Sequence, residues 1–313
     1  MSTSVRVGTE STATLGGRRE TLFSRIARQT GRMGLLFPAV ALMAVFLVGP
    51  IAYSVYGSLT NAALSGYKAA NPEFVGLENY VELLTSGAFW KAVLLTVIFV
   101  FASAVVGQNI LGLALAMLMR KAPKILSTLV GGVVVIAWVM PEIVAAFALY
   151  AFFSTDGTLN VLLSYIGLGG TTWLLTFPMF SVIMANIWRG TAFSMMVYSA
   201  ALAEVPPEIQ EAAKVDGARG WQRFFFVTLP MIKGSISTNL LLTTLQTLGV
   251  FTLLWVMTGG GPGTQSTTLP VMAYQEAFKN SLIGYGTAIA TVTIVLGALF
   301  ALVYIRALKP EVD

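Results

Sequence analysis

Histidine and cysteine are both absent from the 313 residues of this chain. Their absence excludes disulfide bonds, thiolate nucleophiles, zinc sites built from Cys and His, and histidine acid–base catalysis. Charged residues are also scarce, at 11% of the chain, whereas hydrophobic residues reach 56% and the mean hydropathy is +0.78. So few polar residues cannot cover a soluble globule of this length, and the composition therefore predicts an all-α integral membrane protein.

Six apolar stretches are long enough to cross a bilayer as helices. They comprise residues 34–56, 92–119, 126–152, 177–200, 234–257 and 283–305. The first stretch follows basic residues as a signal peptide would, but it exceeds the length of a signal core and is expected to remain as a span. Pro141 falls inside the third stretch and is expected to kink or interrupt that helix.

The domain organisation follows from these stretches. Residues 1–33 are rich in Ser, Thr, Gly and Arg and are predicted to form a basic cytoplasmic N-terminal tail. Residues 34–306 form the six-span membrane domain, and residues 307–313 form a C-terminal tail. Within the domain, residues 77–84 are expected to form a short helix outside the membrane.

The basic residues predict how the spans are oriented. If the N-terminal tail, the 120–124 connection, the 201–233 loop and the C-terminal tail lie on one side of the membrane, that side carries fifteen Lys and Arg residues. The other side keeps only Lys68, Lys91 and Lys279. By the positive-inside rule, both termini and the 201–233 loop are cytoplasmic.

Residues 204–230 form a polar segment between two long apolar runs. Pro206 and Pro207 suit the first turn of a helix, and Gly217 can adopt the left-handed conformation that ends one. About ten residues of helix are expected between them. A second short helix is expected over residues 221–227, with Pro230 breaking the chain after it.

The residues of this segment resemble a known motif. Glu211-Ala212-Ala213, Gly217, Val227 and Leu229-Pro230 are similar in type and spacing to the EAA loop of binding-protein-dependent ABC importer permeases, with Val227 in place of the usual Ile. The fuller string, with Pro207-Glu208 and Val215-Asp216-Gly217-Ala218, resembles the maltose-type carbohydrate permease family. Without this resemblance, an ordinary amphipathic helix at the membrane surface would be the simpler interpretation.

The resemblance implies a type I ABC importer permease fold in the bacterial plasma membrane. It implies that the loop forms a coupling helix seated in a groove of the ATPase, and that one such chain supplies half of a translocation pathway for a sugar. The residues implied in coupling are Glu211, Ala212, Ala213, Asp216, Gly217, Leu229 and Pro230.

The resemblance also implies which partners the chain requires. These are a second homologous permease, two copies of an ABC ATPase and an extracytoplasmic solute-binding protein. The chain itself would be no enzyme and would hold no cofactor, because ATP and Mg would bind to the ATPase. The Gly-rich string GGGPGTQST at residues 259–267 lacks the Gly-Lys-Ser/Thr ending of a phosphate-binding loop.

Polar side chains near the middle of the predicted spans are candidates for the substrate pathway, because such groups tend to face a bundle interior or a water-filled path. Hydrogen bonding between helices is the alternative role for each of them, and Glu142 and Arg189 could instead neutralise one another. Trp138, Trp188 or Tyr150 could stack on a sugar ring. The pathway candidates are Gln108, Asn109, Glu142, Asn186, Arg189, Gln246 and Thr247.

Other functions are compatible with parts of the sequence. A self-sufficient secondary transporter would need a site for a coupling ion, yet Glu142 is the only carboxylate in the middle of a predicted span. A non-transporting assembly or sensor subunit would tolerate loss of the mid-span polar residues. An intramembrane enzyme fits least, because His, Cys and paired carboxylates are missing. The solute could be a mono-, di- or oligosaccharide or a glycerol-phosphate-type compound.

Overall fold

The computed structural model describes residues 37–307, and all structural statements below refer to these residues. The described chain is helical apart from loops and one isolated antiparallel bridge between Thr60 and Phe74. The predicted all-α class is therefore confirmed. The predicted tails at residues 1–33 and 307–313 lie outside the described residues, except for Ala307.

The described chain divides into two units, with the boundary between Tyr53 and Ser54. In the first unit, a helix begins at Phe37 and contains a π-helical segment, η1, at Ala44–Val48. Its side chains are largely exposed within the chain, as expected of a helix whose apolar surface faces lipid. Helix α2 (Gly49–Ser58) continues from this unit into the second one.

The second unit begins with short helices followed by a long one. Helices α3 (Tyr67–Ala70) and α4 (Glu78–Thr85) precede the long helix, and α4 confirms the short helix predicted for residues 77–84. The long helix runs from Gly87 to Lys121 without a break, and Ser86 caps it by accepting a hydrogen bond from the Phe89 amide. A π-helical segment divides it into three parts: α5 (Gly87–Val100), η2 (Phe101–Gln108) and α6 (Asn109–Lys121).

The third predicted span is interrupted, as its proline predicts. Helix α7 (Lys124–Val139) ends before Met140-Pro141, and a new helix, α8 (Glu142–Phe153), begins directly after Pro141. Two further short helices, α9 (Thr158–Tyr165) and α10 (Trp173–Thr176), lead to the 26-residue helix α11 (Pro178–Ala203). Helix α11 corresponds to the fourth predicted span.

The remaining helices follow a more broken course than the sequence predicts. The fifth span was expected to be one helix over residues 234–257, but it is divided at residues 249–251, where Gly249 and Phe251 leave the helical conformation. The elements after α11 are α12 (Pro207–Val215), α13 (Gly220–Arg223), η3 (Phe224–Thr228), α14 (Leu229–Met231), α15 (Lys233–Leu248), α16 (Thr252–Met257), α17 (Leu269–Tyr274), η4 (Gln275–Lys279) and α18 (Ile283–Ala307).

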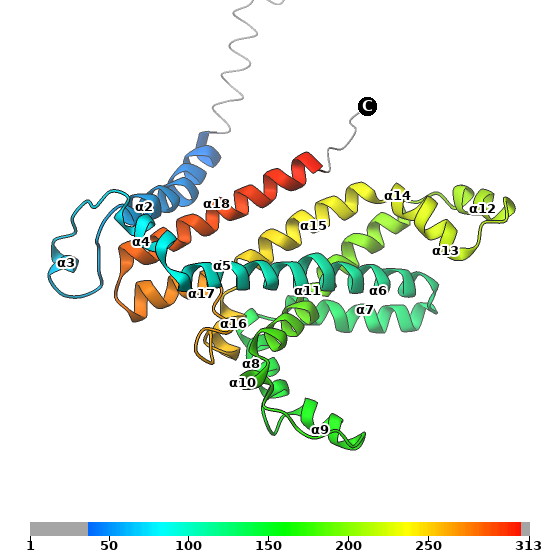
Figure 1. Cartoon of the computed structure of the whole chain (residues 1–313). Helices are drawn as coiled ribbons and strands as arrows, with labels where there is room; N and C mark the ends of the chain where they lie inside the picture. The colour runs from blue at the N-terminus through cyan, green and yellow to red at the C-terminus, as the bar shows by residue number, and fades with distance from the viewer. Residues whose placement is uncertain (1–36, 308–313) are drawn as a thin grey trace, which may run out of the picture. The chain divides into compact units, whose positions relative to one another are not determined.

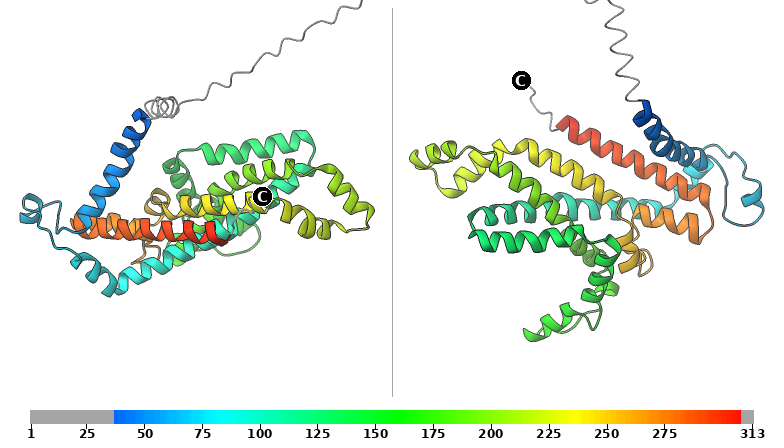
Figure 2. Two further views of the ribbon diagram at one scale, coloured as in Figure 1. Left: turned by 90° about the horizontal axis from the view of Figure 1, so that it is seen from above. Right: turned by 180° about the vertical axis from the view of Figure 1, so that it is seen from behind.

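Length and composition identify four described helices that could cross a membrane. These are Phe37–Ser58, Gly87–Lys121, Glu142–Tyr165 and Ile283–Arg306, and a fifth is obtained if the bent pair Gly220–Met231 and Lys233–Leu248 counts as one span. A multi-pass membrane protein is therefore confirmed, whereas the count of six spans stays a prediction. In the second unit, α11 packs along η2 and α6 on one side and along α15 on another (Figures 1 and 2).

Candidate functional site

The polar segment after α11 forms a helix with the predicted limits. Helix α12 starts at Pro207, whose missing N–H costs nothing in a first turn, and Glu208 and Lys214 lie at the ends where their charges suit the helix dipole. The helix lies at one end of the second unit, beyond the ends of α11 and α15 (Figure 1). The nine residues of α12 confirm the predicted short helix.

Gly217 ends the α12 segment through its backbone conformation. Its φ angle is +79°, in the left-handed region that side chains with a Cβ rarely adopt. The Ala218 amide then donates back to the Ala213 carbonyl at 3.0 Å, which is the pattern of a glycine-terminated helix. No neighbouring atom lies within 4 Å of the position that a Cβ would occupy, so only the backbone conformation requires glycine here.

The second short helix of the loop is longer than predicted. It was expected to end by Val227, with Pro230 breaking the chain, but α13, η3 and α14 form one helical run that continues through Pro230 to Met231. The π-helical turn of η3 explains the difference, because it already shifts the hydrogen bonds that Pro230 would otherwise disrupt. The axis then bends by 70° at Ile232 before α15 begins.

A side-chain hydrogen bond ties the two helices of the loop together. The Gln210 amide of α12 donates to the Thr228 hydroxyl of η3 at 2.8 Å, and this hydroxyl donates in turn to the Arg223 carbonyl. By helical spacing, Ile209, Ala212 and Ala213 lie on one side of α12, and Gln210 and Lys214 lie on another. The loop is therefore a folded unit rather than an extended strap.

The residues implied in coupling are largely available to a partner. Glu211, Ala212, Asp216, Gly217 and Pro230 are exposed, whereas Ala213 and Leu229 are half-buried. Apolar side chains beside them are also exposed, including Val215 at 85% and Phe226 at 71%. Exposed apolar groups around small residues are typical of a surface that another protein covers.

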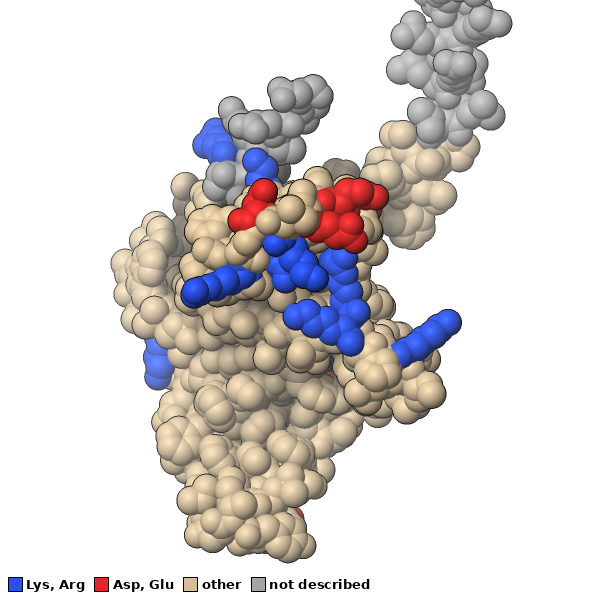
Figure 3. Space-filling model, turned by 90° about the vertical axis from the view of Figure 1, so that its right-hand side faces the viewer, with Lys and Arg blue, Asp and Glu red and all other residues tan. Residues whose placement is uncertain are grey.

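Basic side chains gather at the same end of the second unit. Arg120 and Lys121, in the last turn of α6, line one cavity together with Arg223 of the loop. Figure 3 views this end and shows Lys and Arg side chains spread around the smaller acidic patches. The structure thus brings together two of the basic segments that the charge distribution assigns to one side of the membrane.

Four of the predicted pathway residues lie in a buried polar network between helices. Gln108 donates to the Asn186 carbonyl at 3.0 Å, and Asn186 donates to the hydroxyls of Ser103 at 2.9 Å and Thr247 at 3.3 Å. Each of Gln108, Asn186 and Thr247 is 3% exposed. These residues connect η2, α11 and α15, and their positions match the alternative role of hydrogen bonding between helices.

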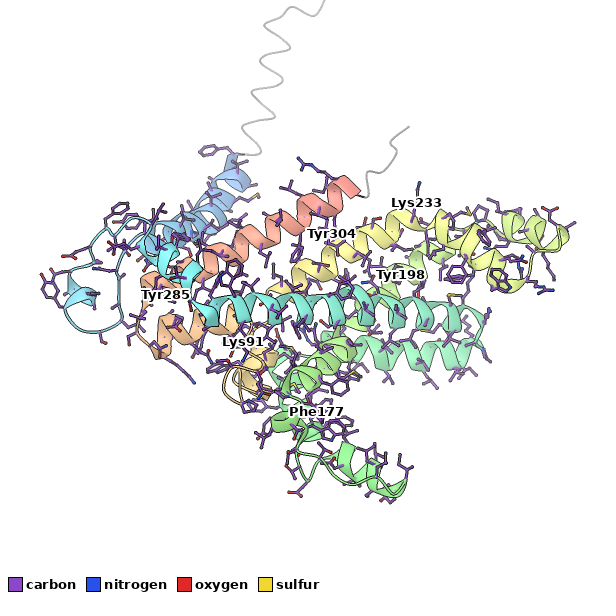
Figure 4. The ribbon with its side chains drawn as sticks, viewed as in Figure 1. Lys91, Phe177, Tyr198, Lys233, Tyr285 and Tyr304 are labelled. Carbon is purple, nitrogen blue, oxygen red and sulfur yellow. The ribbon has the colours of Figure 1, made fainter. Side chains whose placement is uncertain are left out.

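Asn109 is the centre of a second group of these hydrogen bonds. Its Oδ1 accepts from the Tyr198 hydroxyl and from Asn239 at 2.8 Å, and its Nδ2 donates to the Ala104 carbonyl at 2.6 Å. Asn239 also donates to the Ser194 hydroxyl at 2.9 Å. In Figure 4, Tyr198 lies between the ribbons of α15 and α6.

The sequence-based search missed several members of this network. Several of the missed residues lie four residues, or a multiple of four, from residues that the sequence predicted, because each helix turns one polar stripe inward. On α15, Asn239 and Thr243 precede Thr247 at intervals of four, and on α11, Ser194 and Tyr198 continue the stripe of Asn186. Extending each stripe along its helix would have found them.

Glycines allow the helices of the network to approach closely. A Cβ on Gly112 of α6 would lie 2.4 Å from Ser194 Cβ, and one on Gly190 of α11 would lie 2.2 Å from Gln108 Cδ. A Cβ on Gly112 would also lie 2.9 Å from backbone atoms of Ser194 and Met195, so this position requires glycine, whereas a Cβ on Gly190 would force the Gln108 side chain out of its place. Small residues at helix contacts are characteristic of membrane helix packing.

The other three pathway candidates lie outside this network. Gln246 is exposed on α15 although Thr247 beside it is buried, and Arg189 is half-buried on α11. Glu142, at the start of α8, accepts a hydrogen bond from the Leu253 amide at 3.2 Å, beside the break between α15 and α16. No ion pair joins Glu142 to Arg189 within residues 37–307, and the Arg189 Nε is buried without a hydrogen-bond partner.

The aromatic residues considered for sugar stacking are accessible to different extents. Trp138 packs against Phe193 with ring centroids 5.9 Å apart and stays 37% exposed. Trp188 and Tyr150 are each 46% exposed. All three therefore offer accessible apolar surface.

The chain is similar to a protein family and to several known proteins. The model of the binding-protein-dependent transport system inner membrane component family matches residues 108–313. The trehalose/maltose transport system permease protein MalF of Thermococcus litoralis is 31% identical over 290 residues, covering 91% of this chain and 96% of that protein. The sulfoquinovosyl glycerol transport system permease protein SmoG of Agrobacterium fabrum is 33% identical over 285 residues, covering 88% and 90%.

The fold is also similar to a solved structure. A chain of a bacterial ABC transporter involved in the import of the acidic polysaccharide alginate aligns with a TM-score of 0.77 at 24% sequence identity. The alignment covers 94% of this chain and all of that chain. This likeness supports the type I importer permease fold that the resemblance implied.

Proposed function

This chain belongs to the family of binding-protein-dependent transport system inner membrane components, and from that membership we propose that it forms half of the translocation pathway of an ATP-driven sugar importer. Members of this family form the membrane part of an ABC importer, and ATP is hydrolysed by a separate subunit. The family match covers residues 108–313 and therefore includes the whole exposed loop around α12. That combination of family and exposed loop carries the proposal.

The proposed partners are a binding protein outside the membrane, a second permease and two ATPase subunits. Helix α12 would dock on an ATPase, because its small and apolar residues are exposed at the basic end of the second unit. ATP and Mg would act in the ATPase alone. Closure of the ATPases would pull on α12, and its hydrogen bond to η3 would pass the displacement to α15. Such a switch requires partners that bind the two conformations with different affinity.

The seven pathway candidates divide into two proposed roles. Gln108, Asn109, Asn186 and Thr247 would hold the helices in register, because all four are buried and hydrogen-bonded. Gln246, Arg189 and Glu142 would face the solute, because their side chains are at least partly accessible. An amide and a guanidinium can both donate to sugar hydroxyls.

The proposed solute is a saccharide or a sugar-bearing glycerol compound. Support comes from relatives at 31–33% identity whose names specify trehalose, maltose or sulfoquinovosyl glycerol. The break between α15 and α16 lies beside Glu142, and irregular backbone at membrane depth is tolerated where it lines a cavity. This break is thus a suitable place for the solute path.

The test is to purify the tagged chain from its native operon in mild detergent and to identify the proteins that copurify. An ATPase and a second permease are expected with the unaltered chain, and Glu211→Lys is expected to lose the ATPase while keeping the second permease. Glu204→Lys is the matched control, since Glu204 is also exposed but lies before α12. Recovery of a folded chain alone, still able to transport, would show a self-sufficient transporter instead.

A further inference from the structure

Three cationic side chains line one cavity beside the coupling loop. The cavity has a volume of about 360 Å³, and Arg120, Lys121 and Arg223 contribute its charges. Arg120 and Lys121 end α6, whereas Arg223 is the last residue of α13, about a hundred residues further along the chain. A volume of this size lies within the range of small-molecule pockets.

The positive charge of this cavity is not neutralised by the described part of the chain. No acidic side chain of residues 37–307 lines it, and the Arg223 Nε is buried without a hydrogen-bond partner. Three like charges around a partly enclosed space repel one another, and a buried donor of a charged group is costly when left unpaired. An anion in the cavity would remove both costs.

The remaining walls favour one kind of anion. Gln210 and Thr228 are already hydrogen-bonded to each other, so they form a fixed polar wall. Met117, Leu202 and Phe224 add an apolar surface next to the charges. A tetrahedral phosphate with an apolar attachment matches this combination, because guanidinium groups bind phosphate oxygens with paired hydrogen bonds.

We propose that this cavity binds a phosphate group and that the phosphate belongs to the head group of an anionic phospholipid. The end of a long apolar helix places the cavity at the boundary of the bilayer, where basic pockets between helices bind such head groups. A bound lipid would tie the end of α6 to η3 and so stiffen the loop that carries α12. This site is independent of the transported solute.

The first measurement is native mass spectrometry of the intact purified assembly, released from nanodiscs containing equal amounts of phosphatidylglycerol and phosphatidylcholine. Phosphatidylglycerol is expected to be retained preferentially. Lys121→Gln is expected to reduce that preference about fivefold, since one basic residue near an anionic surface contributes about 1 kcal/mol. Arg223→Gln should reduce it at least as much, while Lys124→Gln removes an equal charge outside the cavity and should leave it unchanged.

A second measurement separates lipid from free phosphate. The assembly in phosphatidylcholine nanodiscs is titrated with inorganic phosphate or chloride while its thermal midpoint is followed. A rise with phosphate that Lys121→Gln abolishes, without any preference for phosphatidylglycerol, would assign the phosphate site to a free anion and overturn the lipid assignment. Absence of both effects, or their equal loss in Lys124→Gln, would overturn the phosphate site itself. Loss of the ATPase from the Lys121→Gln assembly, with lipid retention unchanged, would make the cavity a subunit contact.

Discussion

Replacing Gly217 with valine should uncouple transport while leaving the protein in the membrane. The φ angle of +79° places this residue in the left-handed region, which costs a residue with a side chain roughly 1–2 kcal/mol, and more when the side chain is β-branched. A cost of that size changes the population of the observed loop conformation about 5–30-fold. Uptake driven by ATP is therefore expected to fall at least fivefold.

The expected damage is confined to the loop. No atom lies within 4 Å of the site where the Cβ of residue 217 would lie, so the substitution creates no clash with the membrane helices. The amount of protein in the membrane, measured by immunoblot, should be unchanged. Gly217→Asn should retain more uptake than Gly217→Val, because asparagine tolerates the left-handed conformation.

A nearby glycine supplies the matched control. Gly220 is also free of neighbours around its Cβ position, but its φ angle is not positive. Gly220→Val therefore adds the same volume to the same loop without backbone strain. Full uptake by Gly217→Val, or an equal loss in both valine variants, would refute the argument from the left-handed conformation.

Two other contrasts test the helix packing and the pathway. Gly112→Val should prevent assembly of the membrane helices, because its Cβ would lie 2.4 Å from that of Ser194. Gly132→Val should be tolerated, because there is open space around residue 132. The two variants are compared by their yield of monodisperse protein in detergent, and equal yields would contradict this expectation. Asn186→Leu should lower the free energy of unfolding by about 1–2 kcal/mol, because it removes buried hydrogen bonds between membrane helices. A thermal midpoint equal to that of the unaltered chain would show that these hydrogen bonds do not stabilise the helix packing. Gln246→Leu should leave the thermal midpoint unchanged and lower uptake, because Gln246 is exposed and makes no hydrogen bond within residues 37–307; unaltered uptake would remove it from the pathway.

The family and the helix α12 could both be predicted from the sequence. The limits of α12 depend on Pro207 and Gly217, whose effects on backbone angles act within a few residues. The motif around Glu211 has a fixed spacing along the chain, so it can be read without coordinates. The interruption at Pro141 was predictable for the same reason, because proline removes a local hydrogen-bond donor.

The contacts between helices could not be predicted in this way. Asn109 meets Asn239, 130 positions away, and Glu142 binds the Leu253 amide rather than Arg189. Such contacts depend on the rotation and depth of each helix relative to its neighbours, and the hydropathy of the sequence does not specify these.

The sequence alone thus determined that the chain is a membrane permease with a polar helical loop over residues 204–230, because composition and a local motif are properties of the chain itself. Only the tertiary structure decided which mid-span polar groups are buried in a network and which stay accessible. It also decided that the fifth predicted span is divided, and that Arg120, Lys121 and Arg223 share one cavity. These outcomes depend on how close-packed helices satisfy buried polar groups and charges, and that is settled only when all the helices are in place.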